Sequence, residues 1–155
     1  MIARYILLAE DNDNDAELTM AALRESKIIG SIQRVLDGAD ALDFLYKRGA
    51  HAARKDGPPA LILLDLKMPK VDGLEVLKAI KNDPAMHTIP VVMLTSSREE
   101  SDLARCYECG ANAYVVKPVN YDDFMRTVRD IGLFWGLTNE PAPSPPNSSD
   151  QPGVP

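Results

Sequence analysis

Five short apolar runs recur along the chain, and apolar residues repeat every three or four positions in the stretches that follow them. The runs have the length of strands, and the stretches are typical of helices that bury one face. Strands that alternate with helices predict an α/β fold with a parallel sheet. The predicted strands cover residues 5–9, 32–36, 60–65, 89–95 and 113–116.

The predicted helices begin and end at residues that favour helix termini. Ser97 and Glu100 fit a capping box, and Asn120 is an N-cap candidate followed by acidic residues in the next turn. Asn82 and Gly110 mark positions where helices are expected to stop. The five helices are expected over residues 13–27 and 39–46, from Gly73 to Asn82, from Ser97 to Gly110, and from Asn120 onward.

Right-handed crossovers arrange these elements as a doubly wound, five-stranded parallel sheet with strand order 2-1-3-4-5 and five helices. Residues 1–137 then form one domain, in which the polar segment 47–59 is a long loop. From residue 138 to 155, proline, serine and asparagine replace the periodic pattern. That composition predicts a C-terminal tail without a core of its own.

The composition is that of an ordinary globular domain, with 45% hydrophobic and 26% charged residues. A net charge of −6 argues against a nucleic-acid partner, because phosphate backbones select basic surfaces. No apolar stretch approaches the roughly 18 residues that a membrane span needs, so no membrane partner is expected. Cys106 and Cys109 have no further ligands at the spacing of a zinc site. With only two cysteines in the chain, a reducing, cytoplasmic location is expected.

Acidic residues follow two of the predicted strands, at the edge of the sheet where strand ends meet. Glu10 and Asp11 come after the first strand, and Asp65 ends the third. Carboxylates packed together repel one another, and a cation such as Mg2+ relieves the repulsion while keeping waters that a substrate can displace. Thr95 ends the fourth strand and Lys117 follows the fifth, adding a hydroxyl and a positive charge. The set predicts phosphoryl transfer onto Asp65.

Four motifs carry these residues, and together they resemble the receiver domain of two-component response regulators. The resemblance runs over residues 3–135 and implies a flavodoxin-like fold. It also implies that a histidine kinase phosphorylates Asp65, and that the chain is a signalling switch rather than a dedicated enzyme. The motifs are Leu7–Asp11, Leu63–Gly73, Val92–Ser96 and Gly110–Pro118.

The same resemblance implies roles for individual residues of the predicted site. Asp11, Asp65 and the backbone carbonyl of Lys67 would bind Mg2+, and Glu10 would act through a water molecule. Many members of the family carry aspartate in place of Glu10, and the longer side chain favours the water-mediated contact. Lys117 would pair with the phosphoryl group once it has been transferred.

Two further implications concern the conformational switch and the backbone. Thr95 and Tyr114 would form a pair with two arrangements, one for each phosphorylation state. A cis peptide bond would join Lys117 to Pro118. From the residues alone, Tyr114 fits a half-buried strand aromatic as well as a switch.

The polar loop 51–59 and the Phe134–Trp135 pair are similar to features of single-domain regulators that partner bacterial phytochromes. This narrower resemblance implies that a bacteriophytochrome kinase is the phosphoryl donor. From the residues alone, the Phe134–Trp135 pair fits the end of a helix that packs onto the sheet. We further hypothesise that the tail after Thr138 crosses onto a second subunit, so that the C-terminal end contributes to a homodimer.

Three alternatives compete with this interpretation. A phosphorelay intermediate would pass its phosphoryl group on to a histidine phosphotransfer protein. A phosphohydrolase of the haloacid dehalogenase type also uses an aspartyl nucleophile, but it needs a second aspartate where Lys67 stands. A pseudo-receiver that only binds partners would lack one of the acids, the hydroxyl or the lysine. Asp13 and Asp15 are expected to be solvated residues that complement a helix dipole.

Overall fold

The computed structural model describes residues 5–25 and 30–143. Its sheet has five strands, which are β1 (Tyr5–Ala9), β2 (Ser31–Val35), β3 (Leu61–Leu64), β4 (Val91–Thr95) and β5 (Ala113–Val116). The α-helices are α1 (Asp13–Glu25), α2 (Gly38–Tyr46), α3 (Gly73–Asn82), α4 (Glu100–Glu108) and α5 (Tyr121–Leu133). A 3-10 helix, η1 (Gly49–His51), follows α2, and a π-helix, η2 (Phe134–Thr138), continues α5.

The sheet is parallel throughout, with strand order β2-β1-β3-β4-β5, and the predicted topology is therefore confirmed. Ala9, the last residue of β1, lies beside Leu64 at the end of β3. Thr95, the last residue of β4, lies beside Val116 at the end of β5. The carboxyl ends of the strands thus form one edge of the sheet, and the polar residues that follow them lie along it.

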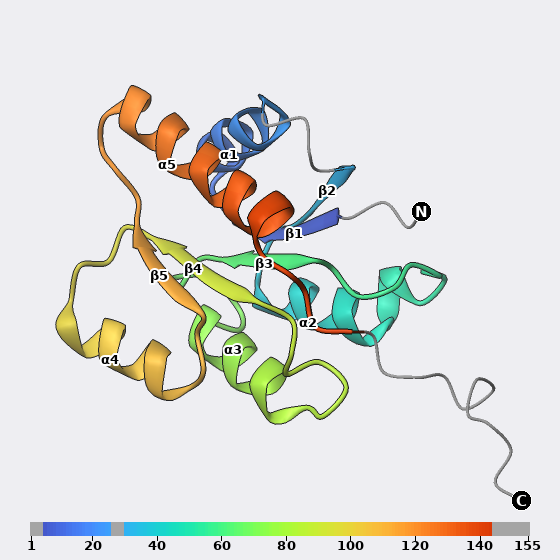
Figure 1. Cartoon of the computed structure of the whole chain (residues 1–155). Coiled ribbons are helices and arrows are strands. Elements are labelled where there is room, and N and C mark those ends of the chain that lie inside the picture. The colour runs from blue at the N-terminus through green and yellow to red at the C-terminus, as the bar shows by residue number, and fades with distance from the viewer. Residues whose placement is uncertain (1–4, 26–29, 144–155) are drawn as a thin grey trace, which may run out of the picture.

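Helices cover both faces of the sheet, with α1 and α5 on one face and α2, α3 and α4 on the other (Figure 1). Side chains of the central strands alternate between the two layers. Leu7 and Leu64 pack on the α3 side, whereas Leu8 and Leu63 pack on the α5 side. Burial on both faces explains why these strands are continuous apolar runs rather than alternating ones.

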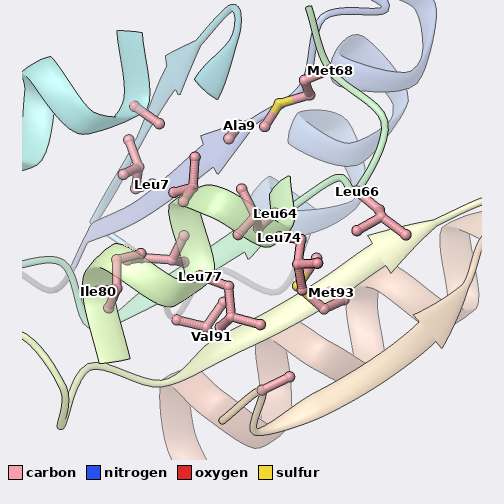
Figure 2. Close-up of a cluster of buried hydrophobic side chains, with 14 of the residues drawn as sticks. Leu7, Ala9, Leu64, Leu66, Met68, Leu74, Leu77, Ile80, Val91 and Met93 are labelled. Carbon is pink, nitrogen blue, oxygen red and sulfur yellow. The ribbon is translucent and has the colours of Figure 1, made fainter. Parts of the chain in front are cut away.

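Helix α3 packs closely on the central strands, as Figure 2 shows. Leu74, Leu77 and Ile80 recur along one side of the helix and belong to the same buried cluster as Leu64 and Met93. Truncating a fully buried leucine to alanine costs about 2–5 kcal/mol in proteins, so this contact fixes the helix firmly. Because α3 follows the end of β3 after a short turn, its packing also fixes the segment that carries Asp65.

The predicted capping box of the fourth helix is wrong. Helix α4 begins at Glu100, and its N-cap residue, Glu99, makes no side-chain capping hydrogen bond. The hydroxyl of Ser97 instead donates to the carboxylate of Asp102, 2.7 Å away within the helix. Serine side chains compete for nearby polar groups in this way, so a serine two residues too early can look like a cap in the sequence.

The predicted loop 47–59 is more ordered than its polar composition suggested. It contains η1, and Arg54 fastens it to the domain. The Arg54 guanidinium donates to the carbonyl of Phe44 at 2.7 Å and to the hydroxyl of Tyr5 at 2.8 Å. It also lies over the Phe44 ring, 3.7 Å from the ring centre. His51 lies within hydrogen-bonding distance of Asp40, so a second side chain attaches the loop to the domain.

The two aromatic residues after α5 differ in burial, because Trp135 is partly buried and Phe134 is exposed. Trp135 packs against the buried cluster on the α5 side, whereas Phe134 is 48% exposed. Packing of the helix end onto the domain is therefore confirmed for Trp135 alone.

The predicted helix end at Lys27 and most of the predicted tail, residues 144–155, lie outside the described residues. Within the described residues, no helix is long and apolar enough to cross a membrane.

Candidate functional site

Three carboxylates meet at the carboxyl edge of the central strands. Glu10 and Asp11 follow β1, and Asp65 follows β3, which pairs with β1. One oxygen from each carboxylate can be chosen so that all three lie within 4.8 Å of one another. Glu10 and Asp65 are buried, whereas Asp11 is exposed. The sequence prediction that these acids share one crevice is confirmed by this geometry.

Lys117, which follows β5, contacts two of the three acids in the cluster. Its Nζ is 2.9 Å from an oxygen of Glu10 and 2.9 Å from an oxygen of Asp65. A third carboxylate, that of Asp15, contacts the same Nζ at 3.0 Å. The Lys117 side chain is only 8% exposed, so its charge is balanced by these neighbours rather than by bulk water.

The expectation that Asp13 and Asp15 are solvated residues of a first helical turn holds for Asp13, whose side chain is 84% exposed, but is wrong for Asp15. Asp15 contacts Lys117, and Asp13 forms an ion pair with Arg34 at 2.8 Å. The sequence alone did not reveal the role of Asp15, because acids in a first helical turn usually complement the helix dipole. The position of Asp15 in the sequence could have indicated its role. Helix α1 begins only three residues after Glu10, so its first turn borders the acidic cluster.

The ionisation of the cluster follows from burial and charge. Burial and the nearby Asp65 carboxylate raise the pKa of Glu10 to about 7, although Lys117 opposes the shift. Burial on its own would lower the pKa of Lys117, but the carboxylates of Asp65 and Glu10 outweigh burial and raise the pKa above its ordinary value. Lys117 therefore stays charged, and the excess of negative charge around it favours a further cation.

The donor set fits a hard divalent cation. Carboxylate oxygens from Glu10, Asp11 and Asp65 are the ligands that Mg2+ and Mn2+ prefer in proteins. Lys67, two residues after Asp65, directs its ammonium away to Asp102 at 3.7 Å, while its backbone N–H donates to an oxygen of Asp65 at 3.4 Å. The ammonium of Lys67 is thus paired outside the cluster, and a role for its carbonyl stays a prediction.

A hydrogen-bonded chain connects Thr95 to Tyr114 through the residue Ser97. The Thr95 side chain is fully buried at the end of β4, and its Oγ1 accepts from the backbone N–H of Ser97 at 3.3 Å. The Tyr114 hydroxyl donates to the carbonyl of Ser97 at 3.0 Å. Both predicted switch residues therefore hold the same loop between β4 and α4.

The predicted cis bond between Lys117 and Pro118 is wrong for this structure. The described residues contain no cis peptide bond, so the bond before Pro118 is trans. The trans isomer of such bonds is intrinsically favoured by only about 0.5–1 kcal/mol, and surrounding contacts decide the isomer. The sequence around Lys117 could not predict those contacts.

The chain matches the family described as "Response regulator receiver domain" over residues 6–129. It is 41% identical over 140 residues to the "Probable methanogenesis regulatory protein FilR2" of Methanothrix harundinacea, covering 90% of this chain and 88% of that protein. It is also 41% identical over 133 residues to the "Response regulator Rcp1" of Synechocystis, covering 85% of this chain and 88% of that protein.

Solved structures agree with these relatives. The Mn2+-bound form of Rcp1 superposes with a TM-score of 0.85 and 38% identity, covering 90% of this chain and 99% of that one. The phosphorylated cyanobacterial phytochrome response regulator RcpA has a TM-score of 0.84 and 38% sequence identity, and the match covers 90% of this chain and 98% of that one. The bacteriophytochrome response regulator RtBRR has a TM-score of 0.73 and 52% sequence identity, and the match covers 92% of this chain and 86% of that one.

Proposed function

Because this chain belongs to the response regulator receiver-domain family, we propose that it is a phosphorylation switch in which Asp65 accepts a phosphoryl group from a histidine kinase. One observation carries the proposal. The buried carboxylate of Asp65 lies within a three-acid cluster and 2.9 Å from the ammonium of Lys117. A buried nucleophile beside one lysine and a set of cation ligands is suited to phosphoryl transfer.

In the transfer, a carboxylate oxygen of Asp65 bonds to the phosphorus of a phosphohistidine. The P–N bond breaks, and its electron pair returns to the imidazole nitrogen of the donor. Lys117, already 2.9 Å from Asp65, is placed to hold an oxygen of the incoming group, and burial of the site strengthens that interaction. The products are an acyl phosphate on Asp65 and an unphosphorylated histidine on the kinase.

Mg2+ is the cation proposed for the cluster. Asp11, Asp65 and the backbone carbonyl of Lys67 would bind it, and Glu10 would reach it through a water molecule. When bound, it neutralises charge on the phosphoryl oxygens during the transfer. The acidic cluster supports a hard cation, and the relative Rcp1 was solved with Mn2+. Mg2+ fits the same donors and keeps coordinated waters that a phosphoryl oxygen can replace.

Thr95 and Tyr114 are proposed to report the phosphorylation state. A phosphoryl oxygen on Asp65 is an acceptor for the Thr95 hydroxyl, which now accepts from the backbone N–H of Ser97. Moving Thr95 toward the phosphoryl group would weaken its hold on Ser97, the residue that Tyr114 also contacts. The equilibrium between two arrangements of the β4–α4 loop would then shift.

The proposed phosphoryl donor is a bacteriophytochrome histidine kinase in the cytoplasm. The support is the 52% identity to the bacteriophytochrome response regulator RtBRR and the likeness to the phytochrome regulator RcpA. Transfer of radiolabelled phosphoryl from a bacteriophytochrome kinase, compared with transfer from an unrelated histidine kinase, tests the pairing. Transfer onward to a histidine phosphotransfer protein would identify a relay intermediate instead.

A homodimer through the C-terminal end is also proposed. Phe134 and Leu137 of η2 are 48% and 64% exposed, and large apolar side chains that cluster on a surface favour a protein contact. Light scattering on the full chain, on a chain ending at Thr138 and on Phe134→Ser measures the effect. If the full chain and the truncated chain contain the same number of subunits, the tail is not part of the interface. If the full chain is a monomer, the proposed dimer is rejected.

The decisive experiment on the function uses intact mass spectrometry. The wild type and Asp65→Asn are incubated with Mg2+ and a small phosphodonor. The wild type should gain one phosphoryl group and the variant none, because an amide cannot form the acyl phosphate. An equal adduct on both proteins would overturn the assignment of Asp65. Beryllofluoride binding to the wild type detects the site even if the phosphoryl group hydrolyses quickly.

A further inference from the structure

Lys117 contacts three carboxylates, but only two of them belong to the proposed cation site. Glu10 and Asp65 are shared between Lys117 and the three-acid cluster. Asp15 contacts Lys117 and lies outside that cluster. A cation that draws Glu10 and Asp65 toward itself therefore leaves Asp15 as the carboxylate with which Lys117 can still pair.

The backbone of Asp15 is held in place for this contact. Its N–H donates to the side-chain oxygen of Asn12 at 2.9 Å, and its carbonyl accepts from the Thr19 hydroxyl at 2.7 Å. Its side chain is 32% exposed, so it sits at the border between the buried Lys117 and solvent. Asp15 and Asp65 bind the same ammonium, which places the two carboxylate oxygens within about 6 Å, where charges interact appreciably near a protein surface.

We propose that Asp15 is a positioning residue that competes with the phosphoryl group on Asp65 for Lys117. The inference rests on the proposed function. An oxygen of a phosphoryl group on Asp65 would pair with the same ammonium that Asp15 contacts. Lys117 must then either break its contact with Asp15 or pair with both anions, each more weakly. Asp15 also repels the phosphoryl group directly, because both are negative and close. Asp15 thus destabilises the phosphorylated state and stabilises the unphosphorylated one.

The competition predicts opposite effects on cations and anions. A negative charge at Asp15 attracts a divalent cation in the cluster and disfavours an anion that mimics the phosphoryl group. Asp15→Asn keeps an oxygen that can accept from Lys117 but removes the charge. Loss of local structure would weaken the binding of both ligands, so the signs of the two changes separate competition from a merely structural role.

The experiment measures two affinities by titration calorimetry on the full chain. The first is for Mg2+ alone, and the second is for beryllofluoride at saturating Mg2+. Asp15→Asn should bind beryllofluoride about three- to tenfold more tightly than the wild type and Mg2+ no more tightly, as expected for the loss of one partly screened charge. Asp15→Ala provides a second variant in which the charge is removed, and it should change the beryllofluoride affinity in the same direction.

Asp13→Asn is the matched control, because Asp13 lies in the same turn of α1, carries the same charge and pairs with Arg34 rather than Lys117. Its beryllofluoride affinity should stay within twofold of the wild type, since exposed charges away from the site are screened. Equal beryllofluoride affinity of Asp15→Asn and wild type, or weaker binding of both ligands to the variant, would overturn the competition alone. A wild type that binds no beryllofluoride would instead remove the proposed function, and the competition with it.

Discussion

Gly73, the first residue of α3, lies against the backbone of Asp65 so closely that a methyl group on Gly73 would overlap the Asp65 carbonyl oxygen. The backbone N–H of Gly73 donates to the carbonyl of Leu66 at 2.8 Å, which draws the two segments together. Because the obstructing atoms belong to the backbone, no side-chain rotation can relieve the overlap. Glycine is therefore required here by the close approach of the helix to the segment that carries Asp65.

Gly73→Ala should disturb the site as well as the fold. Separating α3 from the Asp65 backbone is expected to lower the free energy of unfolding by about 1–3 kcal/mol, the usual cost of overpacking. Displacing Asp65 from the acidic cluster should slow phosphoryl-adduct formation at least about tenfold, since transfer depends on sub-ångström placement. Urea denaturation and timed intact mass measure the two effects.

Gly57→Ala is the control for this change. Gly57 lies in the loop before β3, and a Cβ there would meet no atom within 4 Å. Its stability and rate of adduct formation should equal those of the wild type to within about 0.5 kcal/mol and twofold. A Gly73→Ala variant that phosphorylates at the wild-type rate would show that the close approach has no bearing on the site.

The sequence predicted which polar residues lie at the carboxyl edge of the sheet, because each of them stands at or just after the end of a strand. Five residues end an apolar run or follow one closely, and these are Glu10, Asp11, Asp65, Thr95 and Lys117. The apolar runs predict the strand bounds to within about two residues. A parallel sheet with a known strand order then brings such ends to one edge. No side-chain geometry is needed for that step, only periodicity and topology.

Contacts that depend on how helices rotate and where loops fold back could not be predicted in this way. Asp15 meets Lys117 because α1 packs Ala16 and Leu23 against the sheet, and that packing turns Asp15 toward the crevice. The side chain of Ser97 has several acceptors within reach, and only the folded loop selects Asp102. Differences of about 1 kcal/mol decide such choices, and local sequence does not encode them.

Tyr114→Phe should loosen the loop between β4 and α4 without altering the sheet. The substitution removes the hydrogen bond from the Tyr114 hydroxyl to the Ser97 carbonyl, which is worth about 0.5–1.5 kcal/mol in a part-buried setting. Amide hydrogen exchange of Ser97 should accelerate about tenfold at most, in keeping with that energy. Tyr107→Phe, a half-exposed tyrosine of α4, should leave the Ser97 exchange rate unchanged. Equal exchange in wild type and Tyr114→Phe would show that the hydroxyl does not hold the loop.

The two cysteines should differ sharply in reactivity. Cys106 is fully buried, and burial with the nearby Asp102 raises the pKa of its thiol to about 11, whereas Cys109 is partly exposed. At pH 8 about one Cys106 in a thousand is then a thiolate, so iodoacetamide should modify Cys109 first, as peptide mass mapping can show. In urea both thiols should react at similar rates. Equal modification in the native state would contradict the burial of Cys106.

The same shift predicts the pH dependence of stability. An unfolded thiol ionises near its ordinary pKa of 9.0, whereas native Cys106 retains its proton until about 11. The unfolded state therefore binds fewer protons between these values, and the stabilisation present below pH 9 is lost as the pH rises toward 11. Cys106→Ala removes this contribution, so the stability difference between wild type and variant should shrink over that range. A difference that stays constant with pH would contradict the raised pKa.

Arg54 should be irreplaceable by lysine, because its contacts use the planar fork of the guanidinium. One nitrogen donates to the Phe44 carbonyl, another to the Tyr5 hydroxyl, and the plane lies over the Phe44 ring. An ammonium cannot make all three contacts from one position. Arg54→Lys is therefore expected to lower the free energy of unfolding by about 1–3 kcal/mol and to speed proteolysis within residues 47–59.

Arg48→Lys is the control, since Arg48 belongs to the same loop but is largely exposed and pairs with Asp43 at the surface. Exposed pairs of this kind contribute about 0–1 kcal/mol, so Arg48→Lys should keep nearly the wild-type stability and cleavage rate. Urea denaturation and limited proteolysis with mass mapping give both quantities. Should Arg54→Lys and Arg48→Lys prove equally stable and equally resistant, the loop would be ordered by packing alone, without the guanidinium.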